Sequence, residues 1–167
     1  MAVKFSPNSA LGQALYHWWA SLEHDKGSRA ELRRCTDPVS VILTSAYQRQ
    51  FWAWKALFEG EKGYEDRLAQ IMGLLSHVKS AKEIRSLASQ MAQKNGDTPT
   101  VSELRFRRLL QRQREDLYAP MIRIIRLLDG TVNISDLSES LYYWGDRVRR
   151  EWAYDYFGQG KAKQPTS

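Results

Sequence analysis

The chain has 167 residues, of which 43% are hydrophobic, and it carries a formal net charge of +6 at pH 7. That much apolar material suffices for one packed domain, or for two small lobes that share a core, and it excludes a chain without a folded core. The positive charge favours an acidic partner such as nucleic acid, an anionic membrane or an acidic protein.

Two features of the sequence bear on its location in the cell. Cys35 is the single cysteine, so no disulfide can form within the chain, which suits a reducing cytoplasm. No apolar run approaches the roughly 20 residues that span a membrane, and residues 1–10 lack the apolar core of a signal peptide. We therefore expect a soluble, cytoplasmic protein that has no membrane partner.

The first third of the chain repeats the period of an α-helix. Near the N-terminus, apolar residues three and four positions apart form one stripe, which comprises Leu11, Leu15, Trp18 and Leu22. Ser28 and Glu31 have the spacing of a capping box, which predicts the start of a second helix. Asp37 followed by Pro38 predicts the start of a third helix, which should continue to the break at residues 59–63.

The middle of the chain predicts two more helices and the clearest break. Residues 64–78 predict one helix. Ser80 and Glu83 form a second capping box and predict a more polar helix that ends near Gln93. Residues 94–99, KNGDTP, contain an Asn-Gly pair and a proline, which end this helix.

The last third of the chain predicts three helices. Thr100 and Glu103 form a third capping box at the head of an arginine-rich helix, SELRFRRLLQR. Residues 118–130 predict a short helix, and residues 135–157 predict a long one. The apolar stripe of the long helix comprises Leu137, Leu141, Trp144, Val148 and Trp152.

These elements predict an all-α fold, a compact helical bundle. The break at residues 94–99 would separate an N-terminal helical lobe, residues 8–94, from a C-terminal helical lobe, residues 100–157. Residues 158–167, GQGKAKQPTS, carry no helical pattern and are expected to form a disordered tail.

Arginine dominates the basic residues and is concentrated late in the chain. Sixteen of the 25 basic residues are arginines, and ten of these lie between Arg105 and Arg150. The planar guanidinium group presents a fork of donors that matches phosphate, which the ammonium group of lysine does not. The bias therefore favours phosphate recognition over a surface that is merely soluble.

The segment at residues 102–112 is the strongest candidate for a binding surface. On a helical wheel, two rows of arginines frame an apolar stripe, with Arg105, Arg108 and Arg112 in one row and Arg107 and Arg114 in the other. The alternative is a solvated face whose arginines pair with carboxylates. Between Arg105 and Arg126, however, only Glu115 and Asp116 are available to seven arginines. Because like charges on neighbouring turns repel, we expect a polyanion to bind there.

Two further clusters of arginines are candidates. One lies in the segment RAELRR and comprises Arg29, Arg33 and Arg34. The other lies on the last helix, away from its apolar stripe, and comprises Arg147, Arg149 and Arg150. Asp146 and Glu151 partly offset the last cluster, so an ordinary solvent face of mixed charge stays an equal alternative there.

Some aromatic residues could take part in binding. Three of the six tryptophans lie on the apolar stripes and are expected in the core, namely Trp18, Trp144 and Trp152. Trp19, Tyr143 and Tyr154 lie off the stripes, and exposed rings of this kind can stack on the bases of single-stranded nucleic acid.

Motifs for catalysis are missing from the sequence. His17, His24 and His77 are scattered, and none has the paired spacing of a zinc helix. Cys35 has no second cysteine with which to hold a metal, and no glycine-rich phosphate loop or G-x-S-x-G turn is present. We therefore expect a binding module that is not an enzyme, with no catalytic residue, no metal and no cofactor.

The order of these segments resembles the CasB family, the small subunit of the type I-E CRISPR Cascade surveillance complex. The resemblance is carried by ALYHWWASL, RAELRRCTDP, VSELRFRRLLQ followed by DLYAPMIRIIRLL, and LYYWGDRVRREWAYDYF. It implies a helical, non-catalytic subunit that scaffolds the complex and stabilises the R-loop, including the displaced DNA strand. It also implies several partners, which are the guide-RNA backbone subunits, the large subunit, a second copy of this chain, crRNA, target DNA and displaced single-stranded DNA.

The resemblance adds candidate basic positions to those given by the residues themselves. It implies contacts to nucleic acid from the segments that contain Arg33, Arg34, Arg105, Arg107, Arg108, Arg123, Arg126, Arg147 and Arg149. Two other hypotheses stay open. One is a purely structural subunit whose arginines pair with acidic surfaces of partner proteins, and the other is an RNA-processing enzyme.

Overall fold

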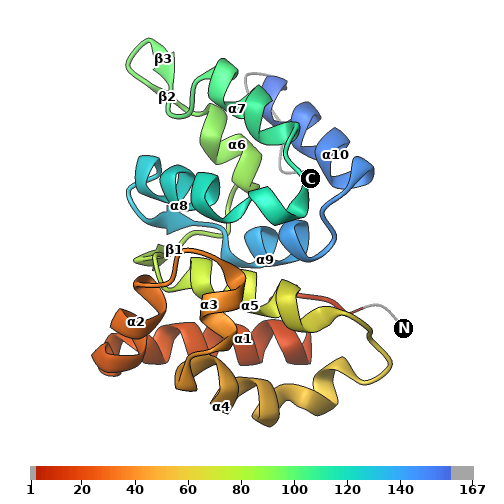
Figure 1. The fold of residues 1–167 in the computed structure, drawn as a ribbon. Coiled ribbons are helices and arrows are strands. Elements are labelled where there is room, and N and C mark those ends of the chain that lie inside the picture. The colour runs from red at the N-terminus through yellow and green to blue at the C-terminus, as the bar shows by residue number, and fades with distance from the viewer. Residues whose placement is uncertain (1–2, 159–167) are drawn as a thin grey trace.

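A computed structural model describes residues 3–158, in which ten α-helices form two layers (Figure 1). The first layer contains α1 (Ala10–Ser21), α2 (Lys26–Arg33), α3 (Pro38–Ile42), α4 (Ser45–Trp54) and α5 (Tyr64–Leu75). The second contains α6 (Leu87–Ala92), α7 (Glu103–Leu110), α8 (Tyr118–Leu127), α9 (Ile134–Tyr142) and α10 (Asp146–Phe157). The all-α prediction is confirmed.

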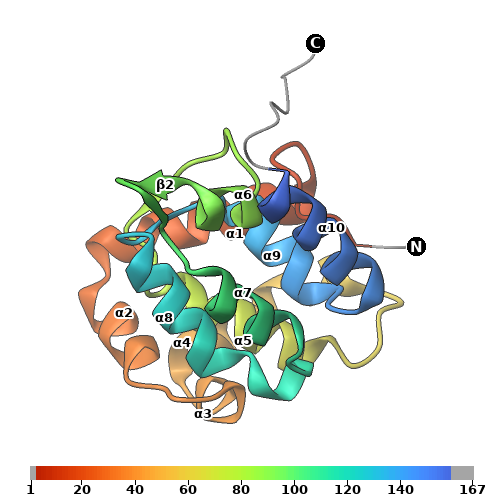
Figure 2. The ribbon, with the colours of Figure 1, turned by 90° about the horizontal axis from the view of Figure 1, so that it is seen from above.

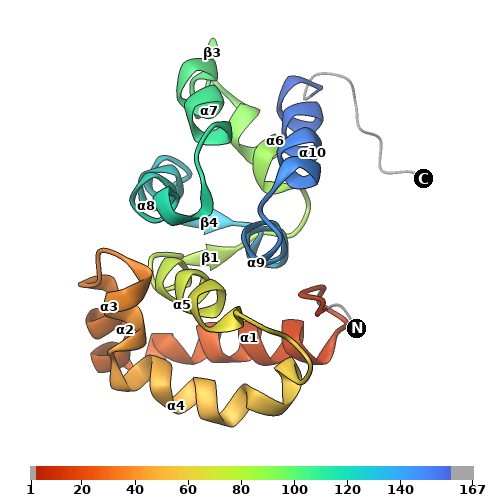
Figure 3. The same cartoon turned by 45° about the vertical axis from the view of Figure 1, so that its right-hand side comes forward.

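The described strands are short, and one pair lies between the two layers (Figure 3). β1 (Ser80–Ala81) pairs in parallel with β4 (Thr131–Val132), which joins the chain just after α5 to the chain just before α9. β2 (Lys94–Asn95) and β3 (Thr98–Pro99) form a small antiparallel hairpin at the predicted KNGDTP break. Gly96 in the hairpin turn has a φ of 77°, a conformation that glycine adopts without strain.

The core is continuous across both layers, with α5 at its centre. Leu68 to Leu75 are buried without interruption, and α5 packs against α3, α8 and α9. Gly73 permits this packing, because a Cβ atom at this position would collide with the Tyr118 hydroxyl and with Val41. Within the described residues, no helix has both the length and the apolarity that a membrane crossing requires.

The predicted apolar stripes are largely confirmed. In the first helix Leu11, Leu15 and Leu22 are buried, whereas Trp18 is only partly buried. The apolar stripe predicted for residues 135–157 is buried at every position, namely Leu137, Leu141, Trp144, Val148 and Trp152. Asp37 is confirmed as a helix N-cap, with its carboxylate accepting a hydrogen bond from the Ser40 backbone N–H.

All three predicted capping boxes are wrong, because a different side chain caps each helix. α2 is capped by Asp25, whose carboxylate accepts a hydrogen bond from the Ser28 N–H, and α6 is capped by Ser86. α7 is capped by Ser102, while the Thr100 hydroxyl donates instead to the carbonyl of Gln93. In place of a helix start at Ser80, the chain forms β1.

Two predicted helices are each divided in two. Residues 38–58 break where Thr44 caps α4 by accepting from the Tyr47 N–H. Residues 135–157 break between α9 and α10, where the Arg114 side chain binds the carbonyl groups of Leu141, Tyr142 and Trp144. The Arg114 guanidinium occupies carbonyl groups that, in a continuous helix, would accept hydrogen bonds from backbone N–H groups one turn further along.

The two predicted lobes remain a prediction. α6 precedes the expected boundary at residues 94–99, yet it packs along α10, which would place it with the second lobe. Of the predicted tail, Gly158 is the last described residue, and residues 159–167 lie outside the described part of the chain.

Candidate nucleic-acid interface

The helix α7 is built around two buried side chains and a polar cap. The Ser102 hydroxyl accepts a hydrogen bond from the Arg105 N–H at 3.2 Å, which satisfies one of the free donors of the first turn. Phe106 and Leu109 are buried, and the Phe106 ring stacks on Tyr156 of α10 with centroids 4.0 Å apart. With these residues turned inward, Arg105, Arg108 and Arg112 face α8.

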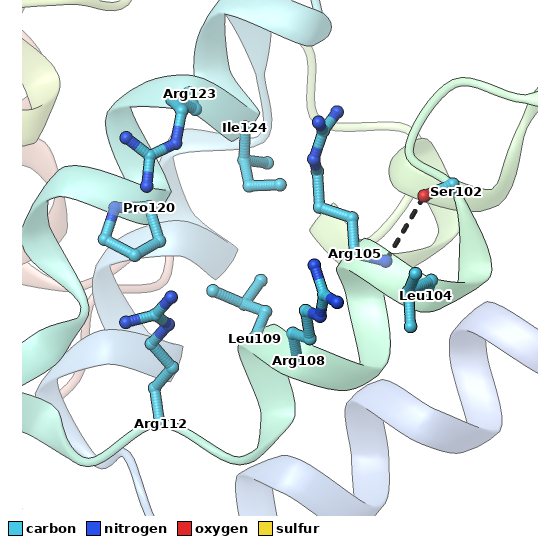
Figure 4. Close-up of a pocket in the computed structure, with 9 residues that line it drawn as sticks. All are labelled: Ser102, Leu104, Arg105, Arg108, Leu109, Arg112, Pro120, Arg123 and Ile124. Atoms are coloured by element: carbon cyan, nitrogen blue, oxygen red, sulfur yellow. Dashed lines mark hydrogen bonds between the residues drawn. The ribbon is translucent and has the colours of Figure 1, made fainter.

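Between α7 and α8 lies a cleft of about 290 Å³, which we term the arginine cleft (Figure 4). Arg105, Arg108 and Arg112 approach it from the α7 side, and Arg123 approaches it from α8. In Figure 4 these four side chains surround Leu109 and Ile124, and none of the residues that line the cleft is an aspartate or a glutamate. The remaining lining residues are Ser102, Leu104 and Pro120.

The four guanidinium groups of the arginine cleft are not engaged by the part of the chain that the structure describes. Within residues 3–158, none of them makes a side-chain hydrogen bond or an ion pair. Four like charges around one hollow repel each other, and the repulsion falls when an anion enters. A phosphate group suits such a hollow, because guanidinium donors bind phosphate oxygens in pairs.

Arg112 is held in place by residues that follow α9. Its backbone carbonyl accepts hydrogen bonds from Trp144 Nε1 at 2.9 Å and from Arg149 Nη2 at 3.0 Å. The Arg149 guanidinium also lies 5.4 Å from the centre of the Trp144 ring and pairs with Asp146. Arg149 therefore supports the rim of the arginine cleft, and its own charge is already engaged.

Arg114 has a structural role. Its guanidinium donates to the carbonyls of Leu141, Tyr142 and Trp144, which closes the C-terminal end of α9. Burial is the main cause that lowers the pKa of Arg114, with a smaller contribution from Arg67. The second predicted row of arginines, Arg107 and Arg114, therefore does not form a cationic surface that is free to bind a ligand.

Other predicted arginines pair with carboxylates on their own helices. Arg107 pairs with Glu103 at 3.1 Å, and Arg147 pairs with Glu151 at 2.9 Å. We expected only Glu115 and Asp116 to be available to the arginines between Arg105 and Arg126. This expectation is wrong for Arg107, because its partner Glu103 precedes that interval. Arg150 is exposed, and within the described residues its side chain makes no ion pair.

A second basic cluster gathers where α2, α5 and α8 meet. Arg33 Nε donates to the Ser76 carbonyl at 2.8 Å, and Arg29 donates to the carbonyls of Ser76 and Val78. These carbonyls follow the end of α5, where a positive charge is favourable. Burial, together with the nearby charges of Arg33, Arg126 and Arg29, lowers the pKa of His77 to about 4.

The two basic regions are joined by α8. Arg123 in the arginine cleft and Arg126 in the second cluster lie one helical turn apart. α8 therefore links the arginine cleft to the second basic cluster, whereas Arg107 and Arg114 do not line this cleft. Arg34 lies at the end of α2, where it is exposed.

The sequence missed parts of this surface. It did not indicate that Pro120, Leu109 and Ile124 form the apolar floor of the arginine cleft, because the pairing of α7 with α8 is a tertiary contact. Among the off-stripe aromatics, Trp19 and Tyr143 each donate to a backbone carbonyl, whereas Tyr154 is exposed. Within the described residues, no group of histidine, cysteine or acidic side chains could hold a metal ion.

Comparison with known proteins gives one family and one fold. The sequence model of the CRISPR-associated protein Cse2 matches residues 28–157. A chain in the crystal structure of E. coli Cascade bound to a PAM-containing dsDNA target is 22% identical, with a TM-score of 0.69 over 89% of this chain and 95% of that chain. CasB from Thermus thermophilus is 21% identical, with a TM-score of 0.68 over 90% of this chain and 99% of that chain. A comparison with curated protein sequences finds no match.

Proposed function

The chain belongs to the family of the CRISPR-associated protein Cse2, and from this premise we propose that it is the small subunit of a type I-E CRISPR Cascade surveillance complex. In this role it acts in the cytoplasm in antiviral defence, and it catalyses no reaction. Its partners are the other Cascade subunits, a second copy of itself, crRNA and target DNA. The similarity of fold to a chain of E. coli Cascade bound to double-stranded DNA supports the proposal.

The proposed activity is to bind the backbone of nucleic acid and so stabilise the R-loop, including the displaced strand. Opening a DNA duplex against a guide RNA is a near-balanced exchange of one duplex for another, by analogy with other guide-directed effectors. Modest contacts to phosphate therefore suffice to shift this equilibrium toward the R-loop. Such contacts carry no sequence preference, as a subunit that serves every guide requires.

The observation that carries this proposal is the arginine cleft. Four guanidinium groups converge on one hollow without a carboxylate, and none of them is engaged by the rest of the described chain. We assign the strongest phosphate contacts to Arg105, Arg108, Arg112 and Arg123. Arg34, Arg126 and Arg150 extend the surface, while Arg29, Arg33 and Arg149 act mainly by positioning neighbouring segments.

The direct test is fluorescence anisotropy of the purified chain with a labelled single-stranded DNA at low salt. The reversal Arg105→Glu, Arg108→Glu and Arg112→Glu should weaken binding by about tenfold or more, because it replaces attraction to phosphate with repulsion. The matched control, Lys4→Glu, Lys55→Glu and Lys62→Glu, changes the net charge equally, but its residues lie in the N-terminal segment and in the segment between α4 and α5. An equal loss in both variants would mean that net charge alone drives binding, against the proposal.

A purely structural subunit is the alternative, and the ion pairs of Arg107 and Arg147 favour it, because arginines of this chain do pair with carboxylates. Reconstitution of the complex separates the two proposals. If the triple reversal assembles normally but no longer protects the displaced strand, the nucleic-acid role holds. If assembly itself fails, the arginines belong to a protein interface.

A further inference from the structure

The outward face of α10 carries large aromatic side chains in water. Arg150, Tyr154 and Phe157 are four and three positions apart, so they lie on one side of the helix. Tyr154 is 80% exposed and Phe157 is 53% exposed. Most aromatic residues of the chain are buried or partly buried, which makes this pair of exposed neighbours on one helix a feature to explain.

Arg150, a cation that has no ion-pair partner among the described residues, accompanies the two rings. Arg147 on the same helix is paired with Glu151, whereas the Arg150 guanidinium makes no ion pair within residues 3–158. A free arginine in line with exposed aromatic rings is the combination by which proteins hold single-stranded nucleic acid, with the cation on phosphate and the rings on bases.

The position of this face supports the same ligand. Seen from above, α7 lies between α8 and α10 (Figure 2). The Phe157 ring meets the Phe106 ring of α7 edge to face, with centroids 6.0 Å apart. The aromatic face therefore adjoins the helix that carries the arginine cleft.

The face is also rigid, which lowers the entropic cost of binding. α10 packs along α6, the Tyr156 hydroxyl donates to the Val101 carbonyl at 2.6 Å, and Tyr156 stacks on Phe106. With a rise of about 1.5 Å per residue, Tyr154 and Phe157 are about 4.5 Å apart along the helix axis. Both rings are thus presented within one turn of a helix that is anchored to its neighbours.

We propose that Arg150, Tyr154 and Phe157 form a stacking track that binds the unpaired bases of a single-stranded nucleic acid. The inference rests on the proposed function and deepens it, because it names unpaired strands as the preferred ligand. A duplex keeps the faces of its bases stacked inside and cannot offer them to the rings. The stacking track therefore separates single strands from duplexes, which the arginine cleft alone does not.

The test compares two oligonucleotides that share a phosphate backbone, namely oligo(dT) and an abasic oligomer of the same length. The full chain should bind oligo(dT) about tenfold more tightly, because only this strand can stack. Tyr154→Ala should remove most of that difference and leave the affinity for the abasic oligomer unchanged. Tyr154→Leu, which keeps an apolar side chain without a π-face, should behave like the alanine variant.

Trp52→Ala is the matched control, since Trp52 is an exposed ring on α4, in the other layer. This variant should change neither the affinity for oligo(dT) nor the affinity for the abasic oligomer. Equal binding of both oligonucleotides by the unmodified chain, or an unchanged affinity of Tyr154→Ala for oligo(dT), would overturn the stacking track while the phosphate-binding proposal stands. A complex that fails to assemble with Tyr154→Ala, although DNA binding is intact, would assign the rings to a protein interface and also overturn it. Failure to bind either strand would contradict the proposed function itself.

Discussion

Some arginines of this chain hold the fold, some pair with carboxylates on their own helices, and others make no ion pair within residues 3–158. Arg114 is the clearest member of the first group, because its guanidinium closes the end of α9 through three carbonyl groups. Arg105 is typical of the last group, since it lines the arginine cleft and makes no ion pair within the described residues. The same residue type thus stabilises the fold in one place and, as we propose, binds phosphate in the other.

Arg114 should contribute strongly to stability. Arg114→Met should lower the free energy of unfolding by about 2 to 4 kcal/mol, because three carbonyl groups lose their donor. Urea denaturation followed by circular dichroism measures this loss. Arg105→Met is the control and should be nearly neutral, so equal effects of the two variants would contradict the division.

A second prediction concerns His77. The pKa of His77 is lowered from 6.5 to about 4 in the folded chain, chiefly by burial and then by Arg33, Arg126 and Arg29. The unfolded chain therefore binds this proton more readily, so stability is full above about pH 6.5 and falls as the pH drops toward 4. His77→Gln should flatten this part of the stability profile, whereas exposed His24→Gln should not. Parallel profiles for the original chain and His77→Gln would refute the assignment.

At the scale of elements, α7 depends on its cap. Ser102→Ala should cost about 1 kcal/mol of stability, since the Arg105 N–H loses its acceptor. Ser102→Asn and Ser102→Asp should both restore the cap and the melting temperature. Only Ser102→Asn should keep the DNA affinity of the original chain, because the aspartate variant adds a carboxylate to the lining of the arginine cleft. Equal affinities of these two variants would show that the charge of the cleft does not matter for binding.

Much of the helical content was predictable from periodicity, since Leu137, Leu141 and Val148 are buried as their spacing indicated. Helix starts were not predictable in the same way. Asp25 and Ser28 are both good caps three residues apart, and only the packing of the chain decides between them. The break after α9 was also hidden, because it depends on Arg114, which is distant in sequence.

The candidate site was predictable in part. The row of Arg105, Arg108 and Arg112 follows from helical spacing, and the structure places it on one cleft. The contribution of Arg123 needs the pairing of α7 with α8, and the ion pair of Arg107 with Glu103 needs a carboxylate outside the arginine-rich interval. Spacing within a helix is local information, whereas charge pairing and cleft formation are not.

On the scale of the whole molecule, one apolar core extends through both layers, and it includes Trp54 of the first layer and Trp144 and Trp152 of the second. We therefore expect unfolding to be a single cooperative transition. Tryptophan fluorescence and far-ultraviolet circular dichroism should give coincident curves in urea. Two separated transitions would instead mean that the lobes fold independently.

The salt dependence of single-stranded DNA binding is the measurement that would show whether the arginine cleft binds phosphate. Each phosphate that the protein neutralises adds about −0.7 to the slope of log affinity against log salt concentration for a single strand. Replacing Arg105, Arg108, Arg112 and Arg123 by glutamine should therefore reduce the steepness of that slope by about 2 to 3. An unchanged slope in the glutamine variant would contradict the claim, because it would place the phosphate contacts elsewhere on the molecule.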